Sequence, residues 1–191
     1  MQHLAGPMIV GLSIWLFWEY NCSLTSASEK FNPLQVKFYL WSLAVISGSI
    51  VIEIVGAASG LIFGDYAYGN TLQPQVADVP LAIGFAWFSM LLSATAVVQS
   101  IFRRSALKMA GMVAFSMVIF DIVMEPAAVE LRYWHWTTGN IPLQNYVAWF
   151  IISFFFSLFS FRMGLFQEKL SSLTFHAFFA QLGYFGMVIL R

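Results

Sequence analysis

The stretch "FDIVMEPAAVELRYWHW", Phe120–Trp136, ends an apolar run with two carboxylates and continues with a group of aromatic side chains. Asp121 and Glu125 are four residues apart, so in a helix they lie on one face. Pro126 follows at once, and because the residue before a proline tends to leave the helical region, the helix is expected to loosen there. Only 9% of the residues are charged. Two acids at this point therefore indicate a specific role.

The composition predicts an all-α, polytopic membrane helix bundle. Of the 191 residues, 60% are hydrophobic and 20 are Phe. Long apolar runs with few charges are typical of membrane-spanning helices. We interpret residues 1–191 as a single transmembrane domain with about six spans. The expected spans are Leu4–Trp18, Phe38–Ile62, Pro80–Phe102, Met109–Pro126, Gln144–Phe161 and Leu170–Leu190.

The basic residues predict the orientation of the bundle. If the spans alternate, the connections after the first, third and fifth helices share a side with seven of the nine basic residues. The seven are Lys30, Lys37, Arg103, Arg104, Lys108, Arg162 and Lys169. Arg132 and Arg191 lie on the opposite side. Because basic loops favour the cytoplasm, we expect both termini on the outside of a bacterial cytoplasmic membrane.

The sequence also argues against several kinds of protein. A net charge of 0 gives nucleic-acid binding no electrostatic support. The single cysteine, Cys22, excludes an intrachain disulfide and a cysteine-based metal cluster. No spacing indicates a metal site, a phosphate-binding glycine loop, a dinucleotide fold or a Ser-His-Asp constellation. No basic residue precedes Lys30, so we expect no cleaved signal peptide.

Two segments resemble each other and predict a parallel internal repeat of two helix–loop–helix units, at residues 38–102 and 109–162. The first contains "VIEIV", "DYAYG" and "VPLAIGFAW", and the second contains "FDIV", "YWHW" and "IPLQNYVAW" in the same order. Glu53 and Asp121 each precede an aromatic pair by 13 and 15 residues. The pairs are Tyr66 with Tyr68 and Trp134 with Trp136. An axis along the membrane normal would place the two acids at equivalent depths.

Glu53 is expected to point into the bundle. A charge at the centre of a spanning helix costs at least ~2.5 kcal/mol, so such acids have a partner or a task. The same predicted helix carries Gly56, Gly60 and Gly64 at four-residue steps, a stripe that favours close helix packing. Gly60 lies within about 20° of Glu53 on a helical wheel. The alternative to a catalytic role is a structural hydrogen bond to a neighbouring helix.

Asp121 and Glu125 have no Lys or Arg within any predicted span to neutralise them. Burial then favours the uncharged carboxyl, which makes both acids candidate general acids. One alternative stays open, in which Glu125 is a solvated residue at the membrane boundary and Asp121 hydrogen-bonds Asn145 or a loop amide.

Aromatic side chains around these acids have two interpretations. Tyr and Trp collect at membrane interfaces, which would explain Tyr66, Tyr68, Trp134 and Trp136. Ring faces that line a cavity would instead stabilise a cationic intermediate. Trp87 and Trp149 lie about two turns inside their predicted helices, below the usual aromatic belt, so we favour a cavity role for them.

Other polar residues near the aromatics give weaker signals. His135 could relay protons, although a histidine in the interfacial belt is more common. Asp65 and Asp78 stand in the loop after the second predicted helix, where turn-forming or capping roles are the default.

An acid without a cofactor, metal or nucleophile can protonate an electron-rich alkene. The tertiary carbocation would be stabilised by rings and carboxylates and then captured by water or lost to cyclisation. Such a substrate would arrive through the lipid, so we expect a long polyene or isoprenoid.

The ordered motifs "GAASGLIFGDYAYG", "VP…W", "D…MEP" and "W.W…IP..N…W" resemble the carotenoid-biosynthesis membrane proteins that include the bisanhydrobacterioruberin hydratases and the carotenoid 1',2'-hydratases. The resemblance covers roughly Glu53–Trp149. It implies addition of water, without a cofactor, to the terminal double bond of an acyclic ψ end group. The substrate would be lycopene, γ-carotene or a C50 analogue, with other carotenoid-pathway enzymes as partners.

The resemblance also implies roles for individual residues. The matching acids, with expected catalytic roles, are Glu53, Asp65, Asp121 and Glu125. The expected substrate-binding residues are Tyr66, Tyr68, Trp87, Trp134, Trp136, Asn145 and Trp149. Because the predicted repeat makes Glu53 and Asp121 symmetry mates, we hypothesise that one protonates the alkene and the other orients the attacking water.

Two other functions fit the same residues. A lycopene-cyclase-like enzyme shares the cation but excludes water, so its products contain rings and no added oxygen. A proton-coupled transporter or carotenoid-binding membrane protein would use the acids as a relay. A transporter responds to a proton gradient, whereas a hydratase works in detergent without one.

Overall fold

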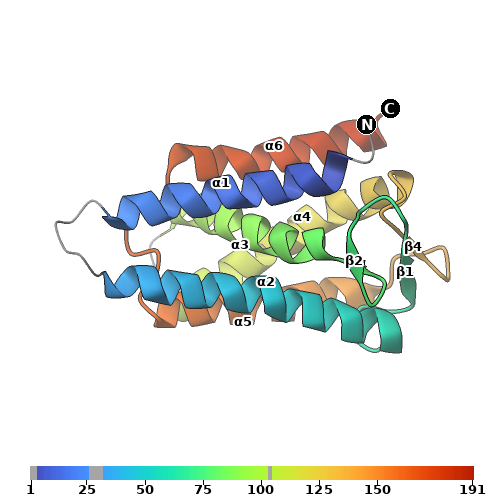
Figure 1. The fold of residues 1–191 in the computed structure, drawn as a ribbon, viewed down its shortest axis with the longest axis horizontal. Helices are drawn as coiled ribbons and strands as arrows, with labels where there is room; N and C mark the ends of the chain where they lie inside the picture. Colours follow the sequence, from blue (N-terminus) through green and yellow to red (C-terminus); the bar gives the residue numbers. More distant parts are fainter. Residues whose placement is uncertain (1–3, 26–31, 103–104) are drawn as a thin grey trace.

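The computed structural model describes residues 4–25, 32–102 and 105–191 of the chain. In this part of the chain, six helices of alternating direction form one bundle (Figure 1). They are α1 (Ala5–Thr25), α2 (Pro33–Ser59), α3 (Leu81–Ile101), α4 (Ala106–Glu130), α5 (Leu143–Arg162) and α6 (Ser172–Ile189). The expected all-α membrane bundle is confirmed, and five of these helices, all except α1, are long and apolar enough to cross a membrane.

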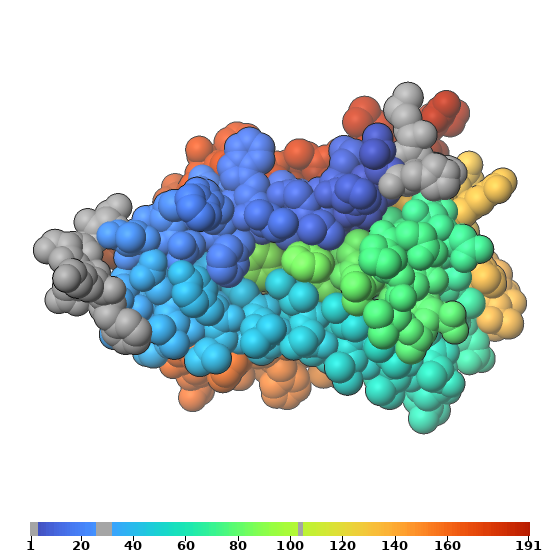
Figure 2. Space-filling model, in the orientation of Figure 1, coloured from blue at the N-terminus to red at the C-terminus, as the bar shows by residue number. Residues whose placement is uncertain are grey.

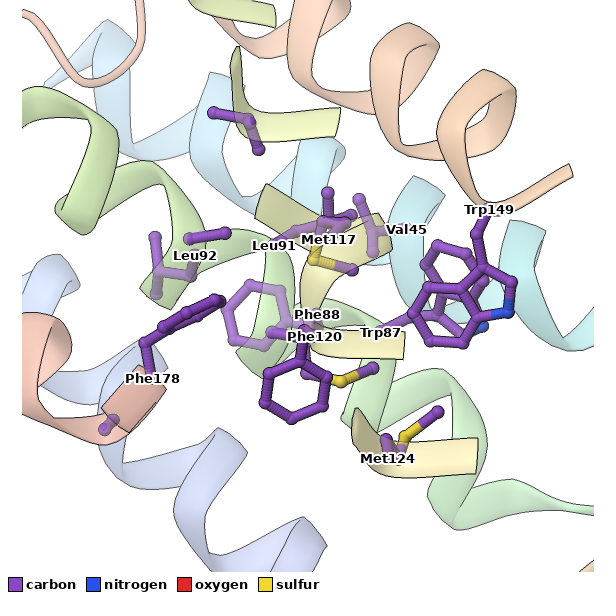
Figure 3. Packing of buried hydrophobic residues seen from close by; sticks show 14 of the residues in the cluster. Val45, Trp87, Phe88, Leu91, Leu92, Met117, Phe120, Met124, Trp149 and Phe178 are labelled. Atoms are coloured by element: carbon purple, nitrogen blue, oxygen red, sulfur yellow. The ribbon is translucent and has the colours of Figure 1, made fainter. Parts of the chain in front are cut away.

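Helix α3 lies at the centre of the bundle. It is hydrophobic and buried on nearly every face, because α1, α2, α4 and α6 all pack against it. Phe88, Leu91 and Leu92 of α3 lie in the apolar core with residues of α2 and α4 (Figure 3). The outer helices instead leave large apolar side chains exposed, as lipid-facing helices do.

Two short antiparallel sheets lie at one end of the bundle. The first pairs β1 (Tyr66–Tyr68) with β4 (Trp134–Trp136), and the second pairs β2 (Gln75–Val76) with β3 (Val79–Pro80). We call the first sheet the β1–β4 ribbon. It joins the two long connections, α2 to α3 and α4 to α5. The described chain ends lie at the same end of the molecule (Figure 1).

Basic side chains gather at the opposite end, where α2, α4 and α6 begin. Lys37, Lys108, Arg162 and Lys169 lie there, whereas Arg132 lies beside the ribbon. Lys30, Arg103 and Arg104, which contribute to the expected orientation, lie outside the described residues. The distribution of the described basic residues between the two ends is therefore as the sequence predicts.

The end of α2 differs from expectation. The helix ends at Ser59 instead of Ile62, because Gly60 adopts a left-handed conformation (φ 67°) that caps it. The predicted stripe of three helical glycines is therefore wrong, since Gly64 lies in the following loop. Gly56 alone stays in the helix, where an added Cβ would lie 2.6 Å from the Phe63 ring. The folded-back loop thus takes the place of a neighbouring helix.

Helix α4 also differs, because it does not loosen at Pro126. The proline lies inside the helix, which continues to Glu130 before Arg132 turns the chain with φ 59°. One missing N–H costs the helix one hydrogen bond, and the turns on both sides retain theirs. Glu125 is consequently a helical residue with 2% of its surface exposed. The interpretation of Glu125 as a solvated boundary residue is wrong.

The internal repeat stays a prediction. In the structure, the aromatic segments of the two predicted repeat units pair with each other. Across the ribbon, Tyr66 is paired with Trp136, Ala67 with His135 and Tyr68 with Trp134.

Candidate active site

A small cavity of about 70 Å³ lies between the helices beneath the β1–β4 ribbon. We call it the acid cavity, because two carboxylates line it in an otherwise aromatic and aliphatic wall. Its lining residues are Ile9, Glu53, Phe63, Tyr66, Tyr68, Leu72, Ile83, Ala86, Trp87, Met90, Met124, Glu125, Tyr133, Trp134, Trp136, Asn145, Trp149, Gln181 and Phe185.

The ribbon places four aromatic side chains over the acids. Successive residues of a strand point to opposite faces, so Tyr66 and Tyr68 share one face of β1 and Trp134 and Trp136 share one face of β4. These four side chains line the cavity. The residues between them, including His135, point the other way and are exposed. His135 is therefore outside the cavity.

Glu53, on α2, accepts three hydrogen bonds and is 5% exposed. Its Oε2 accepts from the hydroxyls of Tyr66 at 2.6 Å and Tyr68 at 2.8 Å. Its Oε1 accepts from the indole Nε1 of Trp87 at 3.0 Å. The carboxyl group is thus held by the ribbon on one side and by α3 on the other.

The two tyrosines lie in the loop outside the spanning helices. Burial first, and then the nearby Glu53 carboxylate, raise the pKa of both the Tyr66 and the Tyr68 phenol. Both hydroxyls therefore keep their protons at neutral pH and are available to donate to Glu53.

Glu125, on α4, is held by a different set of donors. Its Oε2 accepts from the indole nitrogens of Trp134 at 3.0 Å and Trp136 at 2.9 Å. Its Oε1 accepts from the Asn145 side-chain amide at 3.2 Å. Indole N–H groups only donate, so Oε2 of Glu125 is fixed as an acceptor.

Asp121 lies one turn from Glu125 but does not line the cavity. It is fully buried, and its Oδ2 accepts from the Asn145 amide at 2.8 Å. Its Oδ1 has no hydrogen-bond partner among the described residues. The expected bond between Asp121 and Asn145 is therefore present. Asn145, on α5, therefore hydrogen-bonds both acids: Asp121, which lies behind the cavity wall, and Glu125, which lines the cavity.

Trp87 and Trp149 stack inside the cavity wall, with ring centroids 4.2 Å apart and planes at 24° (Figure 3). Trp87 belongs to α3 and Trp149 to α5, so the stack joins the central helix to an outer one. The Trp87 nitrogen is bound to Glu53, which fixes the rotation of its ring. Both rings therefore have a fixed orientation in the cavity wall, where a ring face can contact a bound cation.

Asp65 and Asp78 lie away from the acid cavity. Asp65 is exposed, and its side chain covers Gly60, where an added Cβ would lie 2.1 Å from Oδ1. Asp78 stands at the turn between β2 and β3 with φ 63°. Turn chemistry accounts for both positions, and the structure does not bring Asp65 to the other acids.

Several lining residues carry no sequence signal of their own. Ile9 of α1 and Phe185 of α6 look like ordinary lipid-facing residues, and Met124 is one of nine methionines. Gln181 could have been noticed, because it is an amide inside an apolar span. No group of three or more His, Cys, Asp or Glu in the described part of the chain is placed to hold a metal ion.

Fold and site together define an α-helical membrane protein with a buried pair of cavity-lining carboxylates and no cationic partner among the described lining residues. The chain belongs to the carotenoid biosynthesis protein family, whose model matches residues 8–190. It is also similar to the bisanhydrobacterioruberin hydratase of Haloarcula japonica, with 29% identity over 156 residues. That match covers 78% of this chain and 53% of the relative, so the chain spans about half of the relative's length. No solved structure matches the chain.

Proposed function

We propose that this protein is a carotenoid hydratase that adds water to the terminal double bond of an acyclic ψ end group. The observation that carries the proposal is the pair Glu53 and Glu125, which line one aromatic cavity in a member of the carotenoid biosynthesis family. One carboxyl group can give a proton to the alkene while the other receives a proton from water. The hydratase name of the similar Haloarcula japonica protein agrees with this chemistry.

We assign the proton-donating role to Glu53. Two of its three partners are tyrosyl hydroxyls, and a hydroxyl can either donate or accept a hydrogen bond. Glu53 can therefore keep good hydrogen bonds whether or not it carries a proton. A group that must lose and regain a proton in each turnover needs such partners.

Glu125 is assigned the role of base. The tryptophan indoles leave its Oε2 no partner that could accept a hydrogen bond. A carboxylate held in this way is suited to orient a water molecule and to take its proton.

The reaction then runs in two steps. Glu53 transfers its proton to the less substituted alkene carbon, which leaves a tertiary cation and the Glu53 carboxylate. A water molecule adds to the cation through its oxygen and loses one proton to Glu125, which gives the tertiary alcohol. Transfer of that proton from Glu125 back to Glu53 through water restores the starting state.

Trp149 and Trp87 stabilise the cation between these steps. A ring face attracts a cation more strongly in a site without bulk water, where the contact is worth about 2 kcal/mol. Because Trp87 is already bound to Glu53, the stacked pair stays in place while the charge on the substrate develops.

Asp121 and Asn145 are positioning residues in this scheme. This revises the expectation that Asp121 pairs with Glu53, because Glu125 is the α4 acid on the cavity wall. Asn145 holds Glu125 at the correct rotation and is itself held by Asp121. Asp65, which is exposed, is left without a role in the reaction.

The substrate proposed is lycopene, γ-carotene or a C50 analogue, taken from the lipid bilayer, and other carotenoid-pathway enzymes would supply and consume it. We place the protein in a bacterial cytoplasmic membrane with both termini outside. The acid cavity, which lies at the same end as the termini, then lies toward the outer surface.

The test is pigment analysis in a bacterial host that makes lycopene and γ-carotene, with and without this protein. A new pigment heavier by one water, with unchanged polyene absorption, supports hydration. Unchanged mass with a shortened chromophore would mean cyclisation and would refute the proposal. If neither pigment changes, the same assay with a C50 acyclic carotenoid decides, and no product there refutes the hydratase assignment.

A further inference from the structure

The acid cavity has a polar part and an apolar arm. Its polar part is formed by the ribbon, α2, α4 and α5, which carry the carboxylates and their donors. The apolar arm is formed by α1, α3 and α6. We define the arm by Ile9 of α1, Ala86 and Met90 of α3, and Gln181 and Phe185 of α6.

Exposure shows where the cavity opens. Most lining residues are buried, including both acids and the tryptophans. The partly exposed ones are Tyr68 of the ribbon and four residues of the arm, namely Ile9, Ala86, Gln181 and Phe185. Ala86 is the informative one, because it belongs to the central helix, whose neighbouring residues on this face are buried.

The gap that exposes Ala86 lies between α1 and α6. Both helices pack on α3, and their backbones come close to each other at few points within the described residues. The Thr174 hydroxyl of α6 donates to Glu19 of α1 at 3.4 Å, at the end of the bundle away from the ribbon. The partly exposed lining residues Ile9, Ala86 and Phe185 therefore locate the opening of the cavity between these two helices, at the small side chain of Ala86.

The end of the bundle beside the ribbon is closed by comparison. The loop between β1 and α3 covers this end and packs against the start of α1 (Figure 2). An added Cβ on Gly6 of α1 would lie 3.2 Å from the Gln73 carbonyl oxygen in that loop. Leu72 of the loop and Tyr133 beside β4 are buried in the cavity wall.

We propose that the isoprenoid substrate enters sideways from the bilayer through the gap between α1 and α6, and that its polyene chain stays there during the reaction. The end group then reaches the carboxylates while the chain lies over Ala86, between Ile9 and Phe185. This inference rests on the proposed function and adds the route by which the substrate enters and the position of its polyene chain. A rod-shaped hydrocarbon fits it, because four of the five residues that define the arm are apolar and the arm is continuous with the acid-lined part. The Gln181 amide donates to the Ala177 carbonyl of its own helix at 3.1 Å.

The test fills the gap with Ala86→Phe, which leaves both carboxylates and all of their hydrogen-bond donors in the chain. We expect kcat/KM for lycopene to fall about ten-fold or more, in line with the cost of overfilling an apolar pocket. A short acyclic isoprenoid with the same end group should be hydrated at the wild-type rate, since it does not reach into the gap. A purely structural defect would slow both substrates alike, and that result would overturn the proposal.

Two matched variants complete the test. Ala58→Phe makes the same change at an exposed position of α2 and should alter neither rate. Val147→Phe fills a shallow apolar groove between α5 and the loop after α2, lined by Ile62, Val147 and Ile151 among others. If Val147→Phe slows hydration of lycopene selectively and Ala86→Phe does not, the entrance lies between α5 and that loop and the inference is wrong.

A chemical probe gives an independent readout. In a Cys22→Ser background, Phe185→Cys places a single thiol in the gap, and a lipid-soluble maleimide should label it more slowly when lycopene is bound. An equal slowing by a phospholipid acyl chain alone would mean that the gap holds lipid, which contradicts the proposal. If the wild-type protein hydrates lycopene but neither test responds, the inference fails while the hydratase function stands.

Discussion

Tyr66 and Trp136 are paired across the β1–β4 ribbon, and their rings lie 5.3 Å apart. The Tyr66 hydroxyl donates to Glu53 and the Trp136 nitrogen donates to Glu125. One ring contact thus joins the partners of the two acids, although the residues are 70 positions apart in the chain. The ribbon fixes both carboxylates relative to each other, which is the geometry that a proton donor and a base need.

Removal of the proton donor should abolish hydration. For Glu53→Gln we expect kcat to fall by about 10²–10⁴, the usual contribution of general acid catalysis. Glutamine keeps the size of the side chain and can still accept from Tyr66, so the protein should elute as a single species in detergent. Hydration within tenfold of wild type would remove Glu53 from the acid role.

Loss of one tyrosyl donor to Glu53 should lower the stability of the fold, while Tyr66 and Trp87 still hold the carboxyl group. Tyr68→Phe keeps the ring and removes one hydrogen bond to Glu53, which costs about 0.5–1.5 kcal/mol of folding free energy because the proton donor is uncharged in the resting enzyme. Thermal unfolding in detergent measures the effect. Tyr39→Phe, whose hydroxyl bonds only Asn21 at an exposed site, is the matched control and should change stability far less.

Changes at Asp121 and Asn145 should separate positioning from catalysis. Asp121→Asn should keep most of the hydration activity, because Asp121 does not line the cavity. Asn145→Leu removes the amide shared by two buried acids and should destabilise the fold by about 1–3 kcal/mol and slow the reaction. An Asp121→Asn protein that folds normally but is as inactive as Glu53→Gln would mean that Asp121 is the acid.

The proposed contact between Trp149 and the cation predicts that kcat falls in steps as the indole ring is replaced by a weaker ring and then by an aliphatic side chain. Trp149→Leu removes the ring face and should lower kcat about tenfold, whereas Trp149→Phe keeps a weaker face and should lie between the leucine variant and wild type. The comparison uses lycopene at saturation, so that binding does not limit the rate. Equal rates for the leucine and phenylalanine variants would argue that Trp149 only fills space.

Much of the architecture was predictable, because it depends on local composition. Runs of apolar residues located all six helices, and the isolated acid Glu53 indicated a buried partner or task. The boundaries were less predictable, because they depend on single backbone positions. Gly60 ends α2 in a left-handed conformation, and Pro126 is retained within α4.

The candidate site was only partly predictable, for two physical reasons. Asp121 and Glu125 are about 40° apart around a helix, so a small rotation decides which one faces the cavity. The sequence also does not show that β1 and β4, which are far apart in the chain, pair with each other or in which register. That pairing places the side chains that donate hydrogen bonds to both acids. Ile9 and Phe185 line the cavity because α1 and α6 both pack on α3, and no local pattern in the sequence reports that packing.

The most direct measurement of the proposed roles is deuterium exchange in D₂O with lycopene and the Glu53→Gln and Glu125→Gln proteins. Without its base, Glu125→Gln should still protonate the alkene. The Glu53 carboxylate then takes back a proton from the carbon that received the deuteron, which restores the double bond, and mass spectrometry should find deuterium in recovered lycopene with little hydration. Glu53→Gln should leave lycopene unlabelled and unhydrated. Label with Glu53→Gln and none with Glu125→Gln would reverse the two roles and contradict the assignment.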